Sequence, residues 1–128
     1  MLEPGVSLEK TWVVTDAVSI RFLGNAVKPS LATPSMIMWL EFTARDAVLP
    51  LLDPGQDTVG THVSVSHLAA TPIGMKVISR ATLVKIDRRR LTFSVEAFDE
   101  KEKIGEGTHE RFLIDVARYA ERLKEKLG

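Results

Sequence analysis

The sequence predicts an α+β fold in which a curled antiparallel sheet wraps one long helix. Apolar residues recur at helical spacing over residues 34–51, and after Gly55 the spacing changes to the two-residue alternation of strands. The strand candidates that follow are separated by turns short enough for hairpins, so we expect them to pair antiparallel. The long apolar helix then has to bury its stripe against that sheet.

The first half of the chain contains one predicted strand and the central helix. The strand is expected over Lys10–Val14, and residues 16–31 are expected to form an irregular connection because glycine, asparagine and proline interrupt them. Thr33 followed by Pro34 is typical of a helix start, with the threonine as the capping residue. The Asp-Pro-Gly run at 53–55 ends the helix.

The second half predicts four consecutive strands and a terminal helix. The strands are expected at Val59–Leu68, Lys76–Asp87, Arg90–Phe98 and Lys103–Val116. A last segment, Ala117–Leu127, again has apolar residues at helical spacing. This order of elements is the hot-dog arrangement, and we expect a single such domain over residues 1–128. A ferredoxin-like fold would need a second long helix between strands, which the sequence does not contain.

The composition is that of an ordinary globular protein with balanced charge. Of the 128 residues, 45% are hydrophobic and 27% are charged, which suits one domain with its own core. Lysine plus arginine and aspartate plus glutamate number 17 each. A chain without net charge has no overall field to attract nucleic acid or an anionic membrane, so neither is expected as a partner.

The chain has no cysteine, which excludes disulfides, thiolate nucleophiles and cysteine-ligated metal sites. The amino terminus lacks the cations and apolar run of a signal peptide, and no apolar stretch approaches the ~20 residues that span a bilayer. We therefore expect a cytoplasmic protein. His62 and His67 cannot chelate one metal ion, because their odd spacing on a strand places them on opposite faces, and no metal site is expected.

Glu41 and His67 are the strongest candidates for chemistry. Glu41 lies at the flank of the apolar stripe of the helix, where a carboxylate is costly unless it is paired, so a structural ion pair is the alternative interpretation. His67 shares the helix-facing side of its strand with Val63 and Val65, where a histidine is more often a satisfied core residue. If the two side chains meet between helix and sheet, they form an acid–base pair that works near neutral pH.

A basic cluster marks the predicted hairpin before Arg90. It consists of Lys85, Arg88, Arg89 and Arg90. A solvated turn is the commoner interpretation, and a clamp for a phosphate-bearing ligand is the functional one, because guanidinium groups match phosphate oxygens. No Gly-x-Ser-x-Gly elbow, Walker loop or Gly-x-Gly-x-x-Gly is present, which disfavours those enzyme classes.

Three segments carry a recognisable combination of motifs. They are Ala32-Thr33-Pro34 with Glu41 eight residues after the threonine, Val59-Gly60-Thr61 through His67 to Ala69-Ala70-Thr71-Pro72, and Ile104-Gly105-x-Gly107-Thr108-His109-Glu110-Arg111. From about Thr33 to Arg111, most of the chain, this combination resembles the fluoroacetyl-CoA thioesterase-like family of hot-dog proteins.

The resemblance implies an acyl-CoA thioesterase that works as a homodimer with active sites at the subunit interface, and that needs no cofactor beyond the coenzyme A of its substrate. It implies catalytic roles for Thr33, Glu41 and His67. It also implies a backbone N–H near the acyl group at Gly60 and an acyl-pocket arginine at Arg111. Whether Glu41 attacks the thioester or activates water stays open.

Two features of the sequence qualify this comparison. Residues 22–31 are shorter than the lid of the fluoroacetate-specific enzyme and contain one phenylalanine, Phe22, so the resemblance implies thioesterase chemistry but leaves the acyl-chain specificity open. A regular helix also separates Thr33 from Glu41 by ~12 Å along its axis. Either the start of the helix is distorted, or the catalytic residues join around the substrate, across two subunits.

Two alternatives belong to other functional classes. Asp57 and His62 have a separation similar to that of the catalytic acid and histidine of a hot-dog enoyl-CoA hydratase, although the Asn-Pro expected between them is missing. A non-catalytic acyl-CoA binding module is the other alternative. Thiol release from an acyl-CoA, hydration of crotonyl-CoA and binding without turnover distinguish the three.

Overall fold

The computed structural model describes residues 1–128, and its long elements follow the predicted order. Their bounds are β1 Ser7–Val13, β2 Ser19–Ile20, β3 Ser30–Leu31, α1 Thr33–Val48, β4 Gln56–His67, β5 Lys76–Asp87, β6 Arg90–Phe98, β7 Lys103–Asp115 and α2 Val116–Leu127. No helix is both long and apolar enough to cross a membrane.

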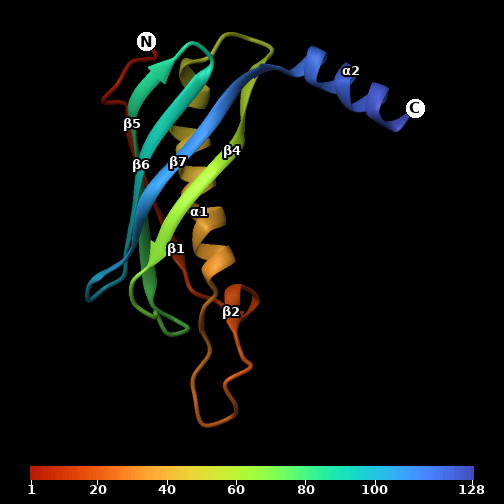
Figure 1. The fold of residues 1–128 in the computed structure, drawn as a ribbon. Coiled ribbons are helices and arrows are strands. Elements are labelled where there is room, and N and C mark those ends of the chain that lie inside the picture. Colours follow the sequence, from red (N-terminus) through yellow and green to blue (C-terminus); the bar gives the residue numbers. More distant parts are fainter.

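One antiparallel sheet contains the five long strands in the order β1-β5-β6-β7-β4. Figure 1 shows the twisted sheet with α1 lying along one of its faces. The predicted α+β arrangement of a sheet around one long helix is confirmed. β1 and β4 are the edges of this sheet, so β4 pairs with β7 on one side only.

α1 turns one face to the sheet and leaves the other uncovered. The buried face comprises Met36, Trp39, Leu40, Thr43, Ala44, Ala47 and Val48. These side chains pack in one core with inward residues of the sheet such as Phe93 and Val95. Burial of this apolar surface stabilises the packing of the helix on the sheet, by ~25 cal/mol for each Å² removed from water. On the opposite face Met38 and Phe42 remain exposed.

The two tryptophans join the helix to the edge strand β1. Trp12 stacks on Trp39 of α1, with ring centroids 5.1 Å apart and planes inclined by 9°. The Trp12 indole Nε1 donates to the Ser79 hydroxyl at 2.8 Å, and the Ser79 and Thr43 hydroxyls lie 2.6 Å apart. Each buried polar atom of this junction is therefore hydrogen-bonded.

The bounds of several predicted segments need correction. β4 begins at Gln56 rather than Val59, because its first residues pair with the end of β7. β1 begins at Ser7 rather than Lys10, because its first residues continue the ladder with β5. The connection over 16–31 is not wholly irregular, since it contains a 3-10 turn and the β2–β3 ladder. α1 ends at Val48 and continues to Leu51 as a 3-10 turn that includes the proline at position 50, where an α-helical hydrogen bond is lost.

Thr33 does not cap the central helix as predicted. The residue at the cap position is Ala32, which supplies no side-chain cap, and Thr33 is the first residue of α1. Its hydroxyl contacts a histidine on β4 instead, as described below.

A one-residue bulge interrupts the ladder between β4 and β7. Gly60 pairs with Arg111 and His62 pairs with Glu110, so Thr61 has no partner residue on β7. The Thr61 hydroxyl donates to the Glu110 carbonyl at 3.2 Å and fixes the bulge. Because strand residues alternate between faces, one inserted residue reverses the alternation beyond it.

The bulge determines which residues of β4 face α1. Before it, Thr58 and Gly60 lie on the inner face, where Thr58 is buried and the Gly60 backbone approaches α1. After it, Val65 packs against the core and His67 contacts the start of α1. Even-numbered positions before the bulge and odd-numbered positions after it therefore lie on the same face of β4.

Candidate active site

Thr33 and His67 form a hydrogen-bonded pair at the start of α1. The Thr33 Oγ1 lies 2.7 Å from the His67 Nδ1, which ties the first residue of the helix to the last residue of β4. The other ring nitrogen of His67, Nε2, is buried and makes no hydrogen bond within the chain. An open cavity of about 660 Å³, lined mainly by apolar side chains such as Leu31 and Leu68, adjoins the pair.

Glu41 lies against the backbone of β4 near the middle of α1. A Cβ atom at Gly60 would be 2.9 Å from the Glu41 Oε2, 3.2 Å from the His109 Cε1 and 3.4 Å from the Arg111 Nη1. Any larger residue would crowd these three groups, so glycine permits the close approach of carboxylate and backbone. Glu41, Gly60 and Val63 line an open cavity of about 380 Å³.

Arg111 is buried beside this cavity, and each of its three nitrogens donates one hydrogen bond within the chain. Its Nε donates to the Thr58 hydroxyl at 2.7 Å, its Nη2 to the Thr58 carbonyl at 2.8 Å, and its Nη1 to the His109 Nε2 at 3.2 Å. The Glu41 Oε2 lies 3.9 Å from Nη1. A buried guanidinium needs such partners because it stays charged. Burial lowers the pKa of Arg111, and the Glu41 carboxylate opposes that shift.

The protonation of His109 follows from its neighbours. Arg111 can only donate, so the His109 Nε2 accepts and the ring proton sits on Nδ1. Nδ1 then donates to the His62 carbonyl at 2.8 Å, next to the bulge. Burial, the largest effect, lowers the pKa of His109, and the charge of Arg111 acts in the same direction. His109 is therefore a neutral imidazole that connects Arg111 to the bulge.

The five predicted site residues fall into two groups within one chain. Thr33 and His67 meet at the start of α1, whereas Glu41, Gly60 and Arg111 meet near its middle. α1 is helical from Thr33 onward, so its start is not distorted, and the two groups are separated by ~12 Å along its axis. No direct contact joins them within the chain.

The acid and histidine that a hydratase would need do not form a pair. The Asp57 carboxylate accepts from the Arg45 Nε at 2.9 Å and Nη2 at 2.7 Å. This hydrogen bonding to Arg45 is the main reason that the pKa of Asp57 lies below its ordinary value. No hydrogen bond joins Asp57 to His62, which lies beyond the bulge. A carboxylate held in this way is a poor base.

Known proteins match this chain over most of its length. A family model described as fluoroacetyl-CoA-specific thioesterase matches residues 14–117. The chain is 38% identical over 95 residues to the fluoroacetyl-CoA thioesterase of Streptantibioticus cattleyicolor, a match that covers 74% of this chain and 68% of that relative. The chain belongs to the fluoroacetyl-CoA-specific thioesterase family.

Solved structures agree with this family membership. A fluoroacetyl-CoA thioesterase superposes with a TM-score of 0.89 at 31% identity over 98% of both chains, and its variant in complex with acetyl-CoA gives 0.88 at 30% over 99% and 100%. A hot-dog-like protein from Thermanaerovibrio acidaminovorans, 20% identical with a TM-score of 0.89 over 98% of this chain and 93% of that one, supports the fold alone. The predicted family, hot-dog fold and thioester hydrolase class are confirmed.

Sequence reasoning missed two residues of this candidate site. His109 lies two residues before Arg111 and so faces the same side of β7. Thr58 precedes Gly60 by two residues and holds Arg111 with two hydrogen bonds. The two-residue spacing was a usable signal, because strand residues at that spacing share a face.

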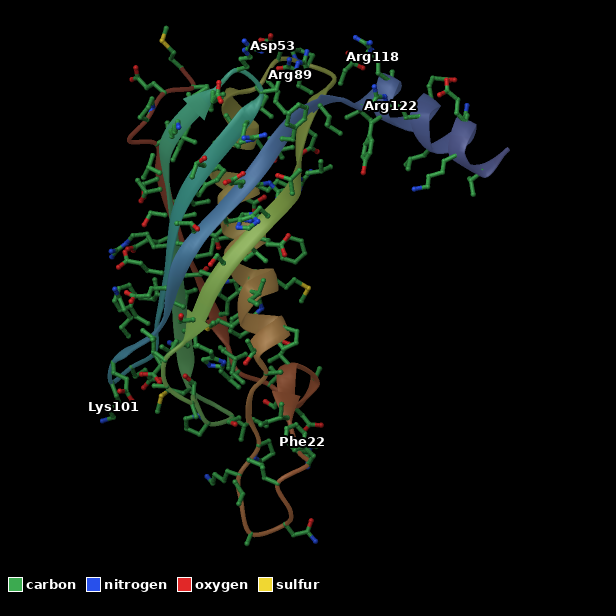
Figure 2. The ribbon with its side chains drawn as sticks, viewed as in Figure 1. Phe22, Asp53, Arg89, Lys101, Arg118 and Arg122 are labelled. Carbon is green, nitrogen blue, oxygen red and sulfur yellow. The ribbon has the colours of Figure 1, made fainter.

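The segment before Thr33 is a short ladder and a loop. β2 and β3 pair over two residues each, and the loop between them carries Phe22, which is exposed at the far end of the molecule from α2 (Figure 2). Phe22 also lines the cavity next to His67. The loop therefore borders the Thr33–His67 pair without closing over it.

We predict that acid destabilises the fold through His109. The unfolded chain binds a proton on this histidine near its ordinary pKa of about 6.5, whereas burial lowers the pKa of His109 in the folded chain. The free energy of unfolding therefore decreases as the pH falls through 6.5 towards the lowered pKa. Melting temperatures measured from pH 7.5 to 5 should fall, and His109→Gln should reduce that slope. His62→Gln, an exposed control on β4, should keep it, and an unchanged slope in His109→Gln would contradict the assignment.

Proposed function

We propose that this enzyme hydrolyses a small or medium acyl-CoA thioester to the free acid and coenzyme A. The observation that carries the proposal is the Glu41 carboxylate held against the Gly60 backbone, beside the buried Arg111. Family membership and the relative solved with acetyl-CoA support coenzyme A as the thiol component. A cytoplasmic location stays a prediction that cell fractionation tests. Independence of any metal or cofactor also stays a prediction, and an assay in the presence of a chelator tests it.

In the proposed reaction, the thioester carbonyl lies against the backbone at the Gly60–Thr61 bulge. A backbone N–H there stabilises the charge that develops on the carbonyl oxygen. Glu41 either attacks the carbonyl carbon or takes a proton from the attacking water. Arg111 fixes the position of the carboxylate and of the acyl group. Water supplies the hydroxyl of the acid and the proton of the released thiol.

Thr33 and His67 serve the same reaction from a second position. The uncharged His67 is able to relay a proton, because burial holds its pKa below the ordinary value, and its Nε2 faces no partner in the chain. The Thr33 hydroxyl fixes the ring through Nδ1. Since Glu41 is ~12 Å away along α1, one thioester cannot touch both groups of a single chain.

A homodimer resolves this separation. We propose that the Thr33–His67 pair of one subunit meets Glu41 of the other at each active site. Three uncovered apolar side chains support such an interface, namely Met38 and Phe42 on the outer face of α1 and Val63 beside Glu41. β4 is an edge strand, and pairing between copies is a common way to cover an edge.

Thiol release from acyl-CoAs of increasing chain length tests the function. We expect turnover of short or medium acyl-CoAs without a preference for the fluoroacetyl group. Glu41→Gln should lower kcat by about 100-fold or more, the scale of losing acid–base assistance. Glu110→Gln is the matched control, a half-buried carboxylate that also faces an arginine, and it should keep kcat. Wild-type turnover in Glu41→Gln would contradict the catalytic role, and no thiol release from any acyl-CoA would contradict the function.

The dependence of activity on pH tests His67. Because burial lowers its pKa, His67 is neutral at pH 7, and kcat/KM should fall only at acid pH as the ring gains a proton. His67→Gln should lower kcat and remove the acid limb. An unchanged acid limb in His67→Gln would assign it to another group.

Mixing two inactive variants tests whether active sites cross the subunit interface. A dimer of one Glu41→Gln chain and one His67→Gln chain contains one site with both native residues only if each site draws on two chains. Coexpression followed by separation on two affinity tags should give mixed dimers with about half of the wild-type activity per dimer. Activity no higher than that of either parent variant, or a monomer in light scattering, would contradict the shared site.

A further inference from the structure

An open cavity of about 410 Å³ lies where the β5–β6 turn, the end of β7 and the first turns of α2 meet. Arg89 comes from the turn, Arg118 and Arg122 come from α2, and Phe112 and Tyr119 add aromatic surface. Figure 2 shows the three arginines at the same end of the molecule, around the junction of the sheet and α2. The proposed catalytic residues do not line this cavity.

The arginines of this cavity are not neutralised by carboxylates. None of Arg89, Arg118 and Arg122 makes an ion pair. Arg89 donates to the Leu113 carbonyl at 3.2 Å, which fixes its position at the end of β7. The one carboxylate in the lining, Asp115, accepts the backbone N–H of Arg118 at 3.2 Å as the cap of α2. The cavity therefore presents a surplus of positive charge.

A second hollow extends this basic surface. Its volume is about 430 Å³, and Arg88, Arg89 and Arg90 line it together with Asp87 and Phe112. Arg89 and Phe112 are common to both hollows. Arg90 faces Glu110 at 3.8 Å, whereas Arg88 has no ion pair. Two adjoining basic hollows suit a ligand with phosphate groups at more than one position.

The chemistry of these residues matches one part of an acyl-CoA. Guanidinium groups bind phosphate oxygens with two parallel hydrogen bonds, and aromatic rings stack on purine bases. The nucleotide end of coenzyme A combines an adenine ring with a 3′-phosphate and a diphosphate. We propose that the arginine cavity binds this phosphorylated nucleotide, an inference that rests on the proposed acyl-CoA thioesterase function.

The distance from the reacting group supports the placement. Arg111 and Asp115 lie four residues apart on β7, or ~13 Å at the rise of a strand. Along the neighbouring edge strand, Gly60 pairs with Arg111 and Gln56 pairs with Asp115. A pantetheine arm spans this distance, from a thioester at Gly60 to a nucleotide beyond Asp115. The arginines provide the positive charge that faces the phosphates.

Kinetics with two thioesters of the same acyl group test the proposal. The first is the acyl-CoA, and the second is the acyl thioester of N-acetylcysteamine, which has no nucleotide. Arg118→Gln with Arg122→Gln should raise KM for the acyl-CoA by about tenfold or more, the scale of losing charge-assisted hydrogen bonds. kcat should stay within about twofold, and kcat/KM for the truncated thioester should not change. A merely structural role would alter both substrates alike.

A matched variant controls for the loss of two charges. Lys101→Gln with Lys124→Gln also removes two cations, from the β6–β7 turn and from α2, outside the cavity lining. It should keep KM for both substrates. An equal rise of KM for the acyl-CoA in both double variants would overturn the proposal, because it would indicate general attraction to a cationic chain. Unchanged KM in the arginine variant would overturn it as well.

Binding of adenosine 3′,5′-bisphosphate separates this proposal from the function on which it rests. Calorimetric titration should detect binding to the wild type and to the lysine variant, and much weaker binding to the arginine variant. A wild type that hydrolyses neither thioester would contradict the proposed function, whereas this titration still decides the nucleotide site. Equal binding of the bisphosphate to all three proteins would overturn the site even if both thioesters are hydrolysed.

Discussion

The bulge at Thr61 is the constraint on which the candidate site depends. β4 has to present residues to α1 at two places, Gly60 near the middle of the helix and His67 at its start. An uninterrupted strand would turn one of these positions outward, because seven residues separate them and strand faces alternate. The unpaired Thr61 restores the alternation, and its hydroxyl bond to β7 holds the extra residue in place.

The burial of Arg111 explains much of what surrounds it. A guanidinium that is only 5% exposed needs a partner for each direction in which it donates. Thr58 and His109 meet that need on two sides, and Glu41 supplies the opposite charge at 3.9 Å. The rigid side of the site is thus built from β4 and β7. Glu41 itself, on α1, remains partly open to solvent.

The fold is predictable from patterns within each element, whereas contacts between distant elements are not predictable in this way. The apolar stripe from Met36 to Val48 and the short turns between strands depend on neighbouring residues, so the central helix and antiparallel sheet followed from the sequence. The sequence around Thr33 is typical of a helix cap, but its hydroxyl contacts a residue 34 positions away. The bulge is not predictable from the sequence, because polar residues around Thr61 obscure the alternation there.

The candidate site divides in the same way. Motif resemblance identified Glu41, His67 and Arg111, but their separation into two groups required the positions of the elements. Helical spacing predicts that Thr33 and Glu41 lie far apart unless the start of the helix is distorted. The structure shows a regular start of α1, so the separation is real. The contribution of His109 depends on the neutral state that burial imposes, which no local pattern reveals.

The stacked indoles at the β1–α1 junction provide an intrinsic spectroscopic probe of the packing between helix and sheet. Trp12 and Trp39 are the two tryptophans of the chain, and their rings stack nearly parallel with centroids 5.1 Å apart. Neither lines the cavities beside Glu41 or His67. Intrinsic fluorescence and near-ultraviolet circular dichroism therefore follow the packing of the helix on the sheet. Changes in those signals during a titration report a loosening of the core rather than occupancy of the cavities.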